Sequence, residues 1–554
     1  MASNKTLAIV VIVILAIAGV GVWYFTTIPA PTENVIVMGT TDSVESSLDN
    51  AQAYDYFGWE IITSLSSGLV EIEPGSQAGP DDIEPALAES WTVSEDGKVW
   101  DFDLRQGVTF DGVRPFNATV VKYTFDRNCN LTGNGLWEPD GPQLNIGYDT
   151  IIDNVTILDT YRVRFYLKIP FAPFLQLMAC AASYMVDPQY APMDELVGYV
   201  DGNARASHPL GLGPYTLEEW TRSGGKDVQI VLRANPYYWN AANGLPKTDK
   251  IIIKMYSDAT ALAQAMSNGE IDVAYRQLTA QQVNNFKNDP NVRVWEGIGA
   301  QIQYLCFNQR VEPLDKVEVR QAIAAALNRT NVCNTVFLGQ ANPLWSIIPA
   351  GMAFHKDSFK IYGDANYTFV REQLAKYGYN ESHKLELTLY YESSGHYPQS
   401  AEQAAVYKQD LEASGVITIH LQGLDWATYR AQRNAGTLQL YIYGWYPDYI
   451  DADNYAFLPF ASWLNMGYND TYPAGGQQQY QLWLNGRSAS TATERQNYYY
   501  QLQDLQAQEC SVIPLWQSNT VAVSKLTVHG IVLDITVNWR HWLLYLGEPA
   551  TTGP

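Results

Sequence analysis

The side chains that could do chemistry gather in one short segment, Gly444–Tyr455, which reads GWYPDYIDADNY. Three carboxylates, Asp448, Asp451 and Asp453, lie within it among aromatic rings. Clustered carboxylates can indicate a calcium site, because Ca²⁺ is bound by oxygen ligands. A calcium loop of the EF-hand type, however, needs a glycine and a terminal glutamate at set positions, and both are missing here. We therefore expect no metal at this segment and no cofactor.

The rest of the sequence offers no motif for catalysis. The seven histidines form no H-x₃-H pair, and the G-x-S-x-G, H-E-x-x-H and P-loop patterns are absent. A Ser/His/Asp triad scattered along the chain stays open, but nothing points to one. A glycosidase would need two carboxylates held roughly 5.5 Å or about 6.5–9.5 Å apart across a groove. We expect a binding protein rather than an enzyme.

A turn-rich β unit is the first of the elements that must position this segment. Within Ile83–Arg127, the residues Trp100, Phe102 and Leu104 alternate with charged residues. Alternation at period two is typical of a strand with one buried face. We therefore expect a half-buried β-ribbon here.

The second half of the chain alternates helices with strands. Val317–Asn328 has the apolar spacing of an amphipathic helix. A strand at Leu385–Tyr391, a helix at Ala401–Ser414 and a strand at Ile417–Gln422 form a β-α-β pattern. Such alternation favours an α/β fold with a mixed or parallel sheet.

Composition excludes several classes of protein. Of the 554 residues, 47% are apolar and 17% are charged, so the chain can bury a large core. The formal net charge of −23 disfavours nucleic acid as a partner. Aromatic residues make up 13% of the chain, including 37 Tyr and 16 Trp. These rings could fill cores and interfaces, or line a cleft that binds ligands.

The N-terminal segment predicts export. Leu7–Phe25 contains no charged residue, and at about 1.5 Å per residue a helix of this length approaches the ~30 Å thickness of the hydrocarbon core. Because Lys5 lies on the short side, we expect a membrane anchor at 1–28, a linker at 29–34 and the rest of the chain outside the cell. A cleaved signal peptide is the alternative, since Ala16-Ile17-Ala18 is an A-x-A site.

Cysteines and glycosylation sequons fit an exported protein. Five cysteines are spread along the chain without a C-x-x-C pair, which disfavours zinc and thioredoxin chemistry. Cys129–Cys180 is our first guess for a disulfide, and buried free cysteines are the alternative. The candidate glycosylation sites are Asn117, Asn130, Asn154, Asn328, Asn366, Asn380 and Asn469. Together with an uncleaved anchor, these sequons favour an archaeal cell surface.

Six segments carry a resemblance to a known family. They are Ile83–Arg127, Gly213-Pro214-Tyr215, Arg233–Trp239, Ala261–Asp272, Leu305–Asn328 and Gly444–Tyr455. In order and spacing they resemble the family 5 extracellular solute-binding proteins, the dipeptide and oligopeptide receptors of ABC importers. The chain departs from the family pattern at Leu212, where Thr is common, at Asn328, where Asp is usual, and at Ala452, where Pro is common.

The resemblance implies a two-lobed, periplasmic-binding-protein-like α/β fold with a small inserted third domain. Lobe I would comprise 35–70, 204–300 and 505–554. The inserted domain would be 71–203, and lobe III would be 301–504. Such lobes close around a ligand by hinge motion.

The same resemblance implies roles for particular residues. Asp448 matches the aspartate that anchors the ligand amine. A bound ammonium group needs such a carboxylate, because a buried charge without a partner is costly. The other candidates for ligand contact are Gly444 and Trp445, the backbone of Gly68 and Leu69, and the rings of Tyr446 and Tyr449, which could equally pack in the core. Arg430 and Arg433 are weak candidates for a ligand carboxylate, and a solvated helix face is their alternative.

We therefore expect a surface-anchored receptor that delivers peptides to an ABC permease. Its partners would be this permease and, through it, the ATPase subunits. An oligosaccharide receptor of the same fold is the main alternative, because aromatic rings stack on sugar faces. An extracellular glycosidase and a structural surface protein are further alternatives. The implied location is the cell membrane, with the bulk of the chain outside.

Overall fold

The computed structural model describes residues 33–45, 47–133, 146–197, 211–276, 278–394, 396–468, 473–536 and 538–549. The predicted anchor at 1–28 and the sequon at Asn469 lie outside these ranges. Within them, no helix combines the length and the apolar character needed to cross a membrane.

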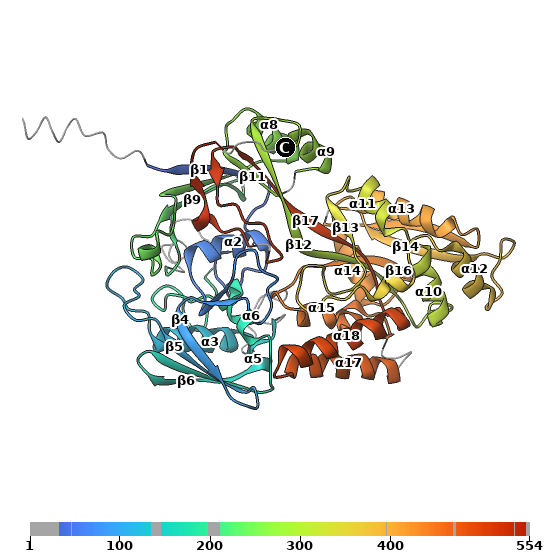
Figure 1. Ribbon diagram of the computed structural model, residues 1–554, viewed down its shortest axis with the longest axis horizontal. Helices are drawn as coiled ribbons and strands as arrows, with labels where there is room; N and C mark the ends of the chain where they lie inside the picture. Colours follow the sequence, from blue (N-terminus) through green and yellow to red (C-terminus); the bar gives the residue numbers. More distant parts are fainter. Residues whose placement is uncertain are drawn as a thin grey trace, which may run out of the picture.

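One large mixed sheet runs through both lobes of the molecule (Figure 1). Its strands, in spatial order, are β15 (Ile417–Leu424), β14 (Leu385–Glu392), β16 (Leu440–Trp445), β12 (Val292–Phe307), β17 (Ile513–Lys525), β11 (Val273–Tyr275), β1 (Val35–Thr40), β10 (Lys250–Met255), β9 (Lys226–Ala234) and β8 (Tyr215–Ser223), with β13 (Ala341–Pro343) beside β17. The β14–β15 pair is parallel, as the β-α-β pattern predicted.

Two long strands, β12 and β17, connect the lobes. They pair with each other on both sides of a register shift between Ile298 and Ile302. Small residues occupy the crossing point, where a Cβ on Gly297 would lie 2.4 Å from the Leu533 carbonyl oxygen and one on Gly299 would lie 2.5 Å from Ser518 Oγ. A bulge of this kind bends a strand and increases its twist. The predicted lobe boundary at 300/301 therefore falls inside a strand rather than in a linker.

A separate four-stranded sheet lies within the predicted inserted domain. Its order is β4 (Ala88–Val93), β5 (Val99–Leu104), β7 (Arg162–Leu167) and β6 (Ile152–Asp159). Trp100, Phe102 and Leu104 are buried on one face of β5, which confirms the alternation read from the sequence. Two short pairs complete the strands: β2 (Val70–Ile72) with β3 (Ile83–Pro85), and β18 (Val528–His529) with β19 (Tyr545–Leu546).

Helices cover the sheets. On the first lobe and the small domain they are α2 (Tyr56–Leu65), α3 (Ala118–Gly133), α5 (Tyr148–Ile151), α6 (Phe174–Met178), α8 (Ala259–Ser267) and α9 (Ala280–Phe286). On the other lobe they are α10 (Val317–Ala326), α11 (Arg329–Thr335), α12 (Tyr367–Ala375), α13 (Ser400–Glu412), α14 (Trp426–Asn434), α15 (Asp453–Ala456), α17 (Pro473–Ser488) and α18 (Ala492–Glu509). Helices α17 and α18 form a pair beside the small domain (Figure 1).

Short 3₁₀ turns complete the connections: η1 (Ala181–Ser183), η2 (Ala241–Asn243), η3 (Ser358–Ile361), η4 (Leu458–Phe460), η5 (Ser462–Leu464) and η6 (His541–Leu543). The predicted amphipathic helix is present as α10, with Val319 and Ile323 fully buried.

The predicted Cys129–Cys180 disulfide is not formed, and all five cysteines are free thiols. Instead, the buried Cys180 thiol donates a hydrogen bond to the backbone carbonyl of Asp448, at 3.0 Å. This hydrogen bond links the small domain to a loop of the other lobe. Burial raises the pKa of Cys180 to about 12, so it stays protonated.

Candidate ligand-binding site

The segment Gly444–Tyr455 forms a loop between the end of β16 and the short helix α15. Asn454 holds this loop together. Its side-chain oxygen accepts the backbone N–H of Asp448 at 2.8 Å, and its backbone carbonyl accepts the indole N–H of Trp445 at 2.7 Å. These bonds fix the direction of the Asp448 side chain relative to the strand.

All three carboxylates of the loop are buried, and among the described residues Asp451 and Asp453 have a cationic partner. Arg495 holds Asp451 in a bidentate ion pair, at 2.6 and 3.0 Å. Arg487 lies 3.2 Å from Asp453, which also accepts the Tyr449 hydroxyl at 2.5 Å. These two aspartates therefore belong to the fold.

Asp448 is the exception. It is 6% exposed, and among the described residues no basic side chain lies within ion-pair distance of it. One carboxylate oxygen accepts the Tyr54 hydroxyl, and the other accepts the Asn454 amide at 3.2 Å. Burial raises the pKa of Asp448 to about 6, although these two hydrogen bonds act in the opposite direction. The charge of the ionised Asp448 carboxylate is therefore stabilised by two neutral donors, the Tyr54 hydroxyl and the Asn454 amide.

The opposite lobe reaches this loop through two tyrosines just before and at the start of α2. The Tyr54 hydroxyl meets the Asp448 carboxylate, and the Tyr56 hydroxyl donates to the Pro447 carbonyl at 3.0 Å. The Tyr56 ring also lies against Tyr446, with the ring centroids 4.5 Å apart. The sequence analysis missed both tyrosines. The local pattern there is Asp55, the N-cap of α2, between two tyrosines, and this pattern does not indicate contact with a distant loop.

A pocket of about 330 Å³ opens beside Tyr446, between the lobes and over the strands that connect them. Tyr446 is 42% exposed, and its hydroxyl donates to Gln301 at 3.0 Å. Arg276 lines the pocket from the first lobe, while Phe337 and Pro398 line it from the second. The volume lies within the range typical of small-molecule sites, about 300–1,000 Å³.

Arg276 carries an ion-pair network that sequence reasoning also missed. It lies 2.8 Å from Asp42 and 2.7 Å from Glu60, and its backbone has a φ of +65°. Burial raises the pKa of Glu60 to about 8, while Arg276 acts to lower it. Burial, with Arg276 nearby, lowers the pKa of His541 to about 3, so this histidine is neutral. Two carboxylates thus face one guanidinium, and the network adds no net positive charge to the cleft.

The other predicted residues of the loop also make contacts within the fold. Gly444 pairs with Gln303 in the sheet, and a Cβ there would lie 2.7 Å from the Tyr397 ring. The Trp445 ring stacks on Trp463, with centroids 5.6 Å apart. Tyr449 is buried and binds Asp453, so it lies in the core rather than in an open pocket.

The contacts that the described residues make with the remaining candidates do not include Asp448. The carbonyls of Gly68 and Leu69 accept backbone hydrogen bonds from Leu87 and Ala88, at 3.2 and 2.8 Å. Arg433 is buried, donates to the Tyr443 hydroxyl and lies over the Trp463 ring. Arg430 is half-buried with its guanidinium over Trp426. None of the four lines the pocket beside Tyr446.

Known proteins resemble most of this chain. Residues 82–465 match the family model described as bacterial extracellular solute-binding proteins, family 5 middle. The chain is 30% identical over 405 residues to the di/tripeptide-binding protein 2 of Pseudomonas aeruginosa, covering 71% of this chain and 72% of that protein. It is 25% identical over 515 residues to the probable D,D-dipeptide-binding periplasmic protein of Escherichia coli, covering 91% of this chain and 92% of that protein.

A solved structure has the same architecture. The ABC transporter-associated periplasmic binding protein of Helicobacter pylori, in complex with the peptide STSA, aligns over 93% of this chain and 98% of its own. The TM-score is 0.72 and the sequence identity is 23%. This likeness confirms the two-lobed α/β fold that the sequence predicted.

Proposed function

The chain belongs to the bacterial extracellular solute-binding proteins of family 5, and from this premise we propose that it captures short peptides outside the cell and delivers them to the permease of an ABC importer. A member of this family is a binding protein and not an enzyme. The observation that carries the proposal of a peptide ligand is the buried, cation-free carboxylate of Asp448, and the relatives that bind di- and tripeptides support it.

Charge complementarity explains why Asp448 suits a peptide amine. Its neighbours in the loop are neutralised by arginines of the same chain, whereas the carboxylate of Asp448 receives a hydroxyl and an amide from the part of the chain that the structure describes. A buried charge is stabilised when a partner of opposite sign arrives. An ammonium group supplies that partner and up to three N–H donors.

The path of the ligand follows from the same geometry. With its amine at Asp448, the peptide would run past the exposed ring of Tyr446 into the pocket beside Arg276. Backbone groups of β16 at Gly444 and Trp445 are proposed to pair with the extended peptide, as in β-augmentation. Closure would bring Tyr54 and Tyr56 onto the loop, through bending at the β12–β17 crossing.

A double-mutant cycle on affinity tests the amine contact. Calorimetry would compare a tripeptide and its N-acetylated form on the wild type and on Asp448→Asn, which keeps the shape of the side chain. Removing either partner should weaken binding by about 2–5 kcal/mol, roughly 30- to 4,000-fold, and removing both should cost little more than removing one. Additive losses would show that Asp448 does not contact the amine. Binding of cello- or xylo-oligosaccharides in place of any peptide would favour the oligosaccharide alternative.

We also propose that residues 1–28 anchor the protein to the membrane and that some sequons are glycosylated, as expected at an archaeal cell surface. Asn154, Asn366 and Asn380 are exposed, so an oligosaccharyltransferase could reach them. Membrane fractionation of the full chain tests the anchor, because a cleaved segment would release the protein from the membrane. Intact-mass measurement before and after deglycosylation tests the sequons.

A further inference from the structure

Hydrogen bonds from three residues hold the backbone on both sides of Asp448. The Tyr56 hydroxyl donates to the Pro447 carbonyl at 3.0 Å, and Asn454 Oδ1 accepts the Asp448 N–H at 2.8 Å, so both act on the peptide group before Asp448. The Cys180 thiol donates to the Asp448 carbonyl at 3.0 Å and acts on the peptide group after it. Because a residue has only two soft backbone dihedrals, holding both peptide groups sets the direction in which the Asp448 side chain leaves the backbone.

Cys180 lies at a corner of the small domain that is itself held by buried amides. It is the N-cap residue of η1, close after the end of α6. The Asn50 amide donates to the carbonyls of Ala182 and Tyr184, at 3.2 and 2.9 Å. The Asn128 amide also donates to the Ala182 carbonyl, at 3.1 Å. The thiol is therefore presented to the loop from a corner with a fixed position.

Gly68, which the family resemblance made a candidate for ligand contact, lies at this same corner. A Cβ on Gly68 would lie 2.8 Å from the Met178 carbonyl oxygen and 2.9 Å from the Tyr184 ring. Real Cβ atoms essentially never approach so closely, so a glycine is needed for the turn between α6 and η1 to pack against the first lobe. Gly68 therefore helps to set the position of Cys180.

A ring contact joins the small domain to the same loop. The Phe171 ring lies edge-on to the Tyr449 ring, with centroids 5.9 Å apart. The guanidinium of Arg487, at the end of α17, lies 4.9 Å over the Phe171 ring. With Cys180 on Asp448 and Phe171 on Tyr449, the small domain contacts two successive residues of the loop.

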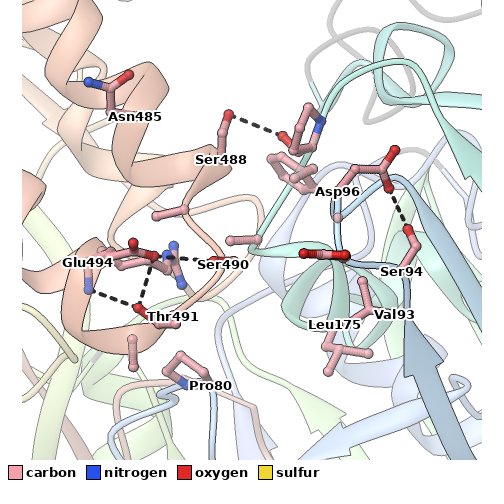
Figure 2. Close-up of a pocket in the computed structure, with 18 of the residues that line it drawn as sticks. Pro80, Val93, Ser94, Asp96, Leu175, Asn485, Ser488, Ser490, Thr491 and Glu494 are labelled. Atoms are coloured by element: carbon pink, nitrogen blue, oxygen red, sulfur yellow. Dashed lines mark hydrogen bonds between the residues drawn. The ribbon is translucent and has the colours of Figure 1, made fainter.

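A pocket of about 530 Å³ lies next to these contacts, between the small domain and the junction of α17 with α18. Figure 2 shows Leu175 on the small-domain wall and Glu494 on the helical wall. At its edge, Ser488 Oγ donates to the Pro170 carbonyl at 3.3 Å (Figure 2). Atoms that line an open pocket have no packing partners on one side. The connection between the small domain and the other lobe therefore depends more on the contacts at the edge of the pocket.

We propose that Cys180 is a positioning residue for the ligand amine, an inference that rests on the proposed function. It acts through the backbone of Asp448 and keeps the carboxylate in the direction that suits the amine. The small domain takes part in ligand binding through this contact. A thiol is a weak hydrogen-bond donor, so the expected effect is moderate.

Hydrogen exchange in the ligand-free protein tests the contact without any peptide. Cys180→Ala removes the donor, whereas Cys180→Ser keeps one, because a hydroxyl also donates. Exchange of the backbone N–H groups in Gly444–Tyr455, measured by mass spectrometry, should be about three- to tenfold faster in Cys180→Ala and return toward the wild-type rate in Cys180→Ser. Cys510→Ala is the matched control, because its buried thiol donates to the Ala507 carbonyl at 3.4 Å. Equal exchange in Cys180→Ala and Cys510→Ala overturns the proposal.

Calorimetry with a tripeptide and its N-acetylated form tests the role in amine binding. Cys180→Ala should weaken binding of the free-amine peptide about three- to tenfold. It should leave the affinity for the acetylated peptide within about twofold, because only the free amine depends on the direction of the Asp448 carboxylate. Cys180→Ser should restore most of the lost affinity. A merely structural effect would weaken both peptides equally, and that result overturns the proposal.

The wild type and Cys510→Ala separate failure of this inference from failure of the proposed function. A wild type that binds no peptide contradicts the proposed function, while faster exchange in Cys180→Ala still supports the hold of Cys180 on the loop. Amine-dependent binding that is equally strong in Cys180→Ala and Cys510→Ala overturns the positioning role alone. Cys180→Val, which also lacks a donor but fills more space, replaces Cys180→Ala if the latter does not unfold cooperatively in urea.

Discussion

Asp451 and Asp448 lie three residues apart in one loop and are equally buried, yet their surroundings differ. Asp451 is 3% exposed and paired with Arg495, whereas Asp448 is 6% exposed and touches only neutral donors. The first carboxylate has its counter-charge within the chain. The second has its charge available to a ligand. Burial alone therefore does not distinguish the two carboxylates, whereas the presence of a cationic partner does.

Removing the paired carboxylate should have the largest effect on stability. Asp451→Asn removes the carboxylate with which Arg495, 2% exposed, forms its ion pair, and so leaves a buried charge without that counter-charge. The free energy of unfolding, measured in urea by circular dichroism, is expected to fall by about 3–5 kcal/mol. Asp451→Asn combined with Arg495→Met should recover much of this loss. A single variant as stable as the wild type would contradict the distinction.

Removing the unpaired carboxylate should have the opposite effect on the ligand-free protein. The pKa of Asp448 is raised from 3.8 to about 6, which at about 1.4 kcal/mol per unit costs the fold about 3 kcal/mol at neutral pH. Asp448→Asn should therefore increase the free energy of unfolding by up to about this amount. The same urea experiment checks it, and a loss of stability would show that Asp448 is structural.

Peptide affinity should fall in acid because of the same carboxylate. With a pKa of about 6, Asp448 is ionised at pH 7 and mostly protonated at pH 5, where it no longer attracts an ammonium. Affinity is expected to fall about tenfold per pH unit below 6, and also above about pH 8, where the peptide amine loses its proton. Calorimetry from pH 4.5 to 9 measures this profile.

Asp448→Asn is the control for that profile and should abolish the acid limb. If peptide affinity still fell with the same slope below pH 6 in this variant, other titrating groups would be responsible for the fall. Two neighbours titrate in this range, since burial raises the pKa of Asp55 to about 7 and that of Glu60 to about 8.

The smallest expected effect concerns the hydroxyl that solvates Asp448. Tyr54→Phe removes a donor to the carboxylate, and because this hydrogen bond lowers the pKa of Asp448, the acid limb should move to higher pH. At pH 7, affinity should fall by about 1–2 kcal/mol. Tyr56→Phe is the matched control, since its hydroxyl donates to the Pro447 backbone and should leave the limb in place. Equal profiles for the two variants would contradict a specific role for Tyr54.

Local patterns in the sequence predicted local structure well. The alternation around Phe102 and the β-α-β pattern after Leu385 are both present, because side-chain periodicity reports directly which face of a strand or helix is buried. The predicted lobe boundary at 300/301 falls within β12, because a strand that runs from one lobe into another carries no boundary signal in its own residues. The Cys129–Cys180 pairing failed for a similar reason, because cysteine count carries no geometry.

The sequence by itself determined the fold class and the family, and its resemblance to that family made Asp448 a candidate for ligand binding. Only the tertiary structure decided which aspartate in the Gly444–Tyr455 loop is unpaired. Arg495 reaches Asp451 from 44 residues away, and Tyr54 reaches Asp448 across 394 residues. Ion pairs and hydrogen bonds depend on separations in space of a few ångströms, whereas periodicity in sequence reports only neighbours along the chain. The difference between the surroundings of these two carboxylates is therefore a property of the folded chain.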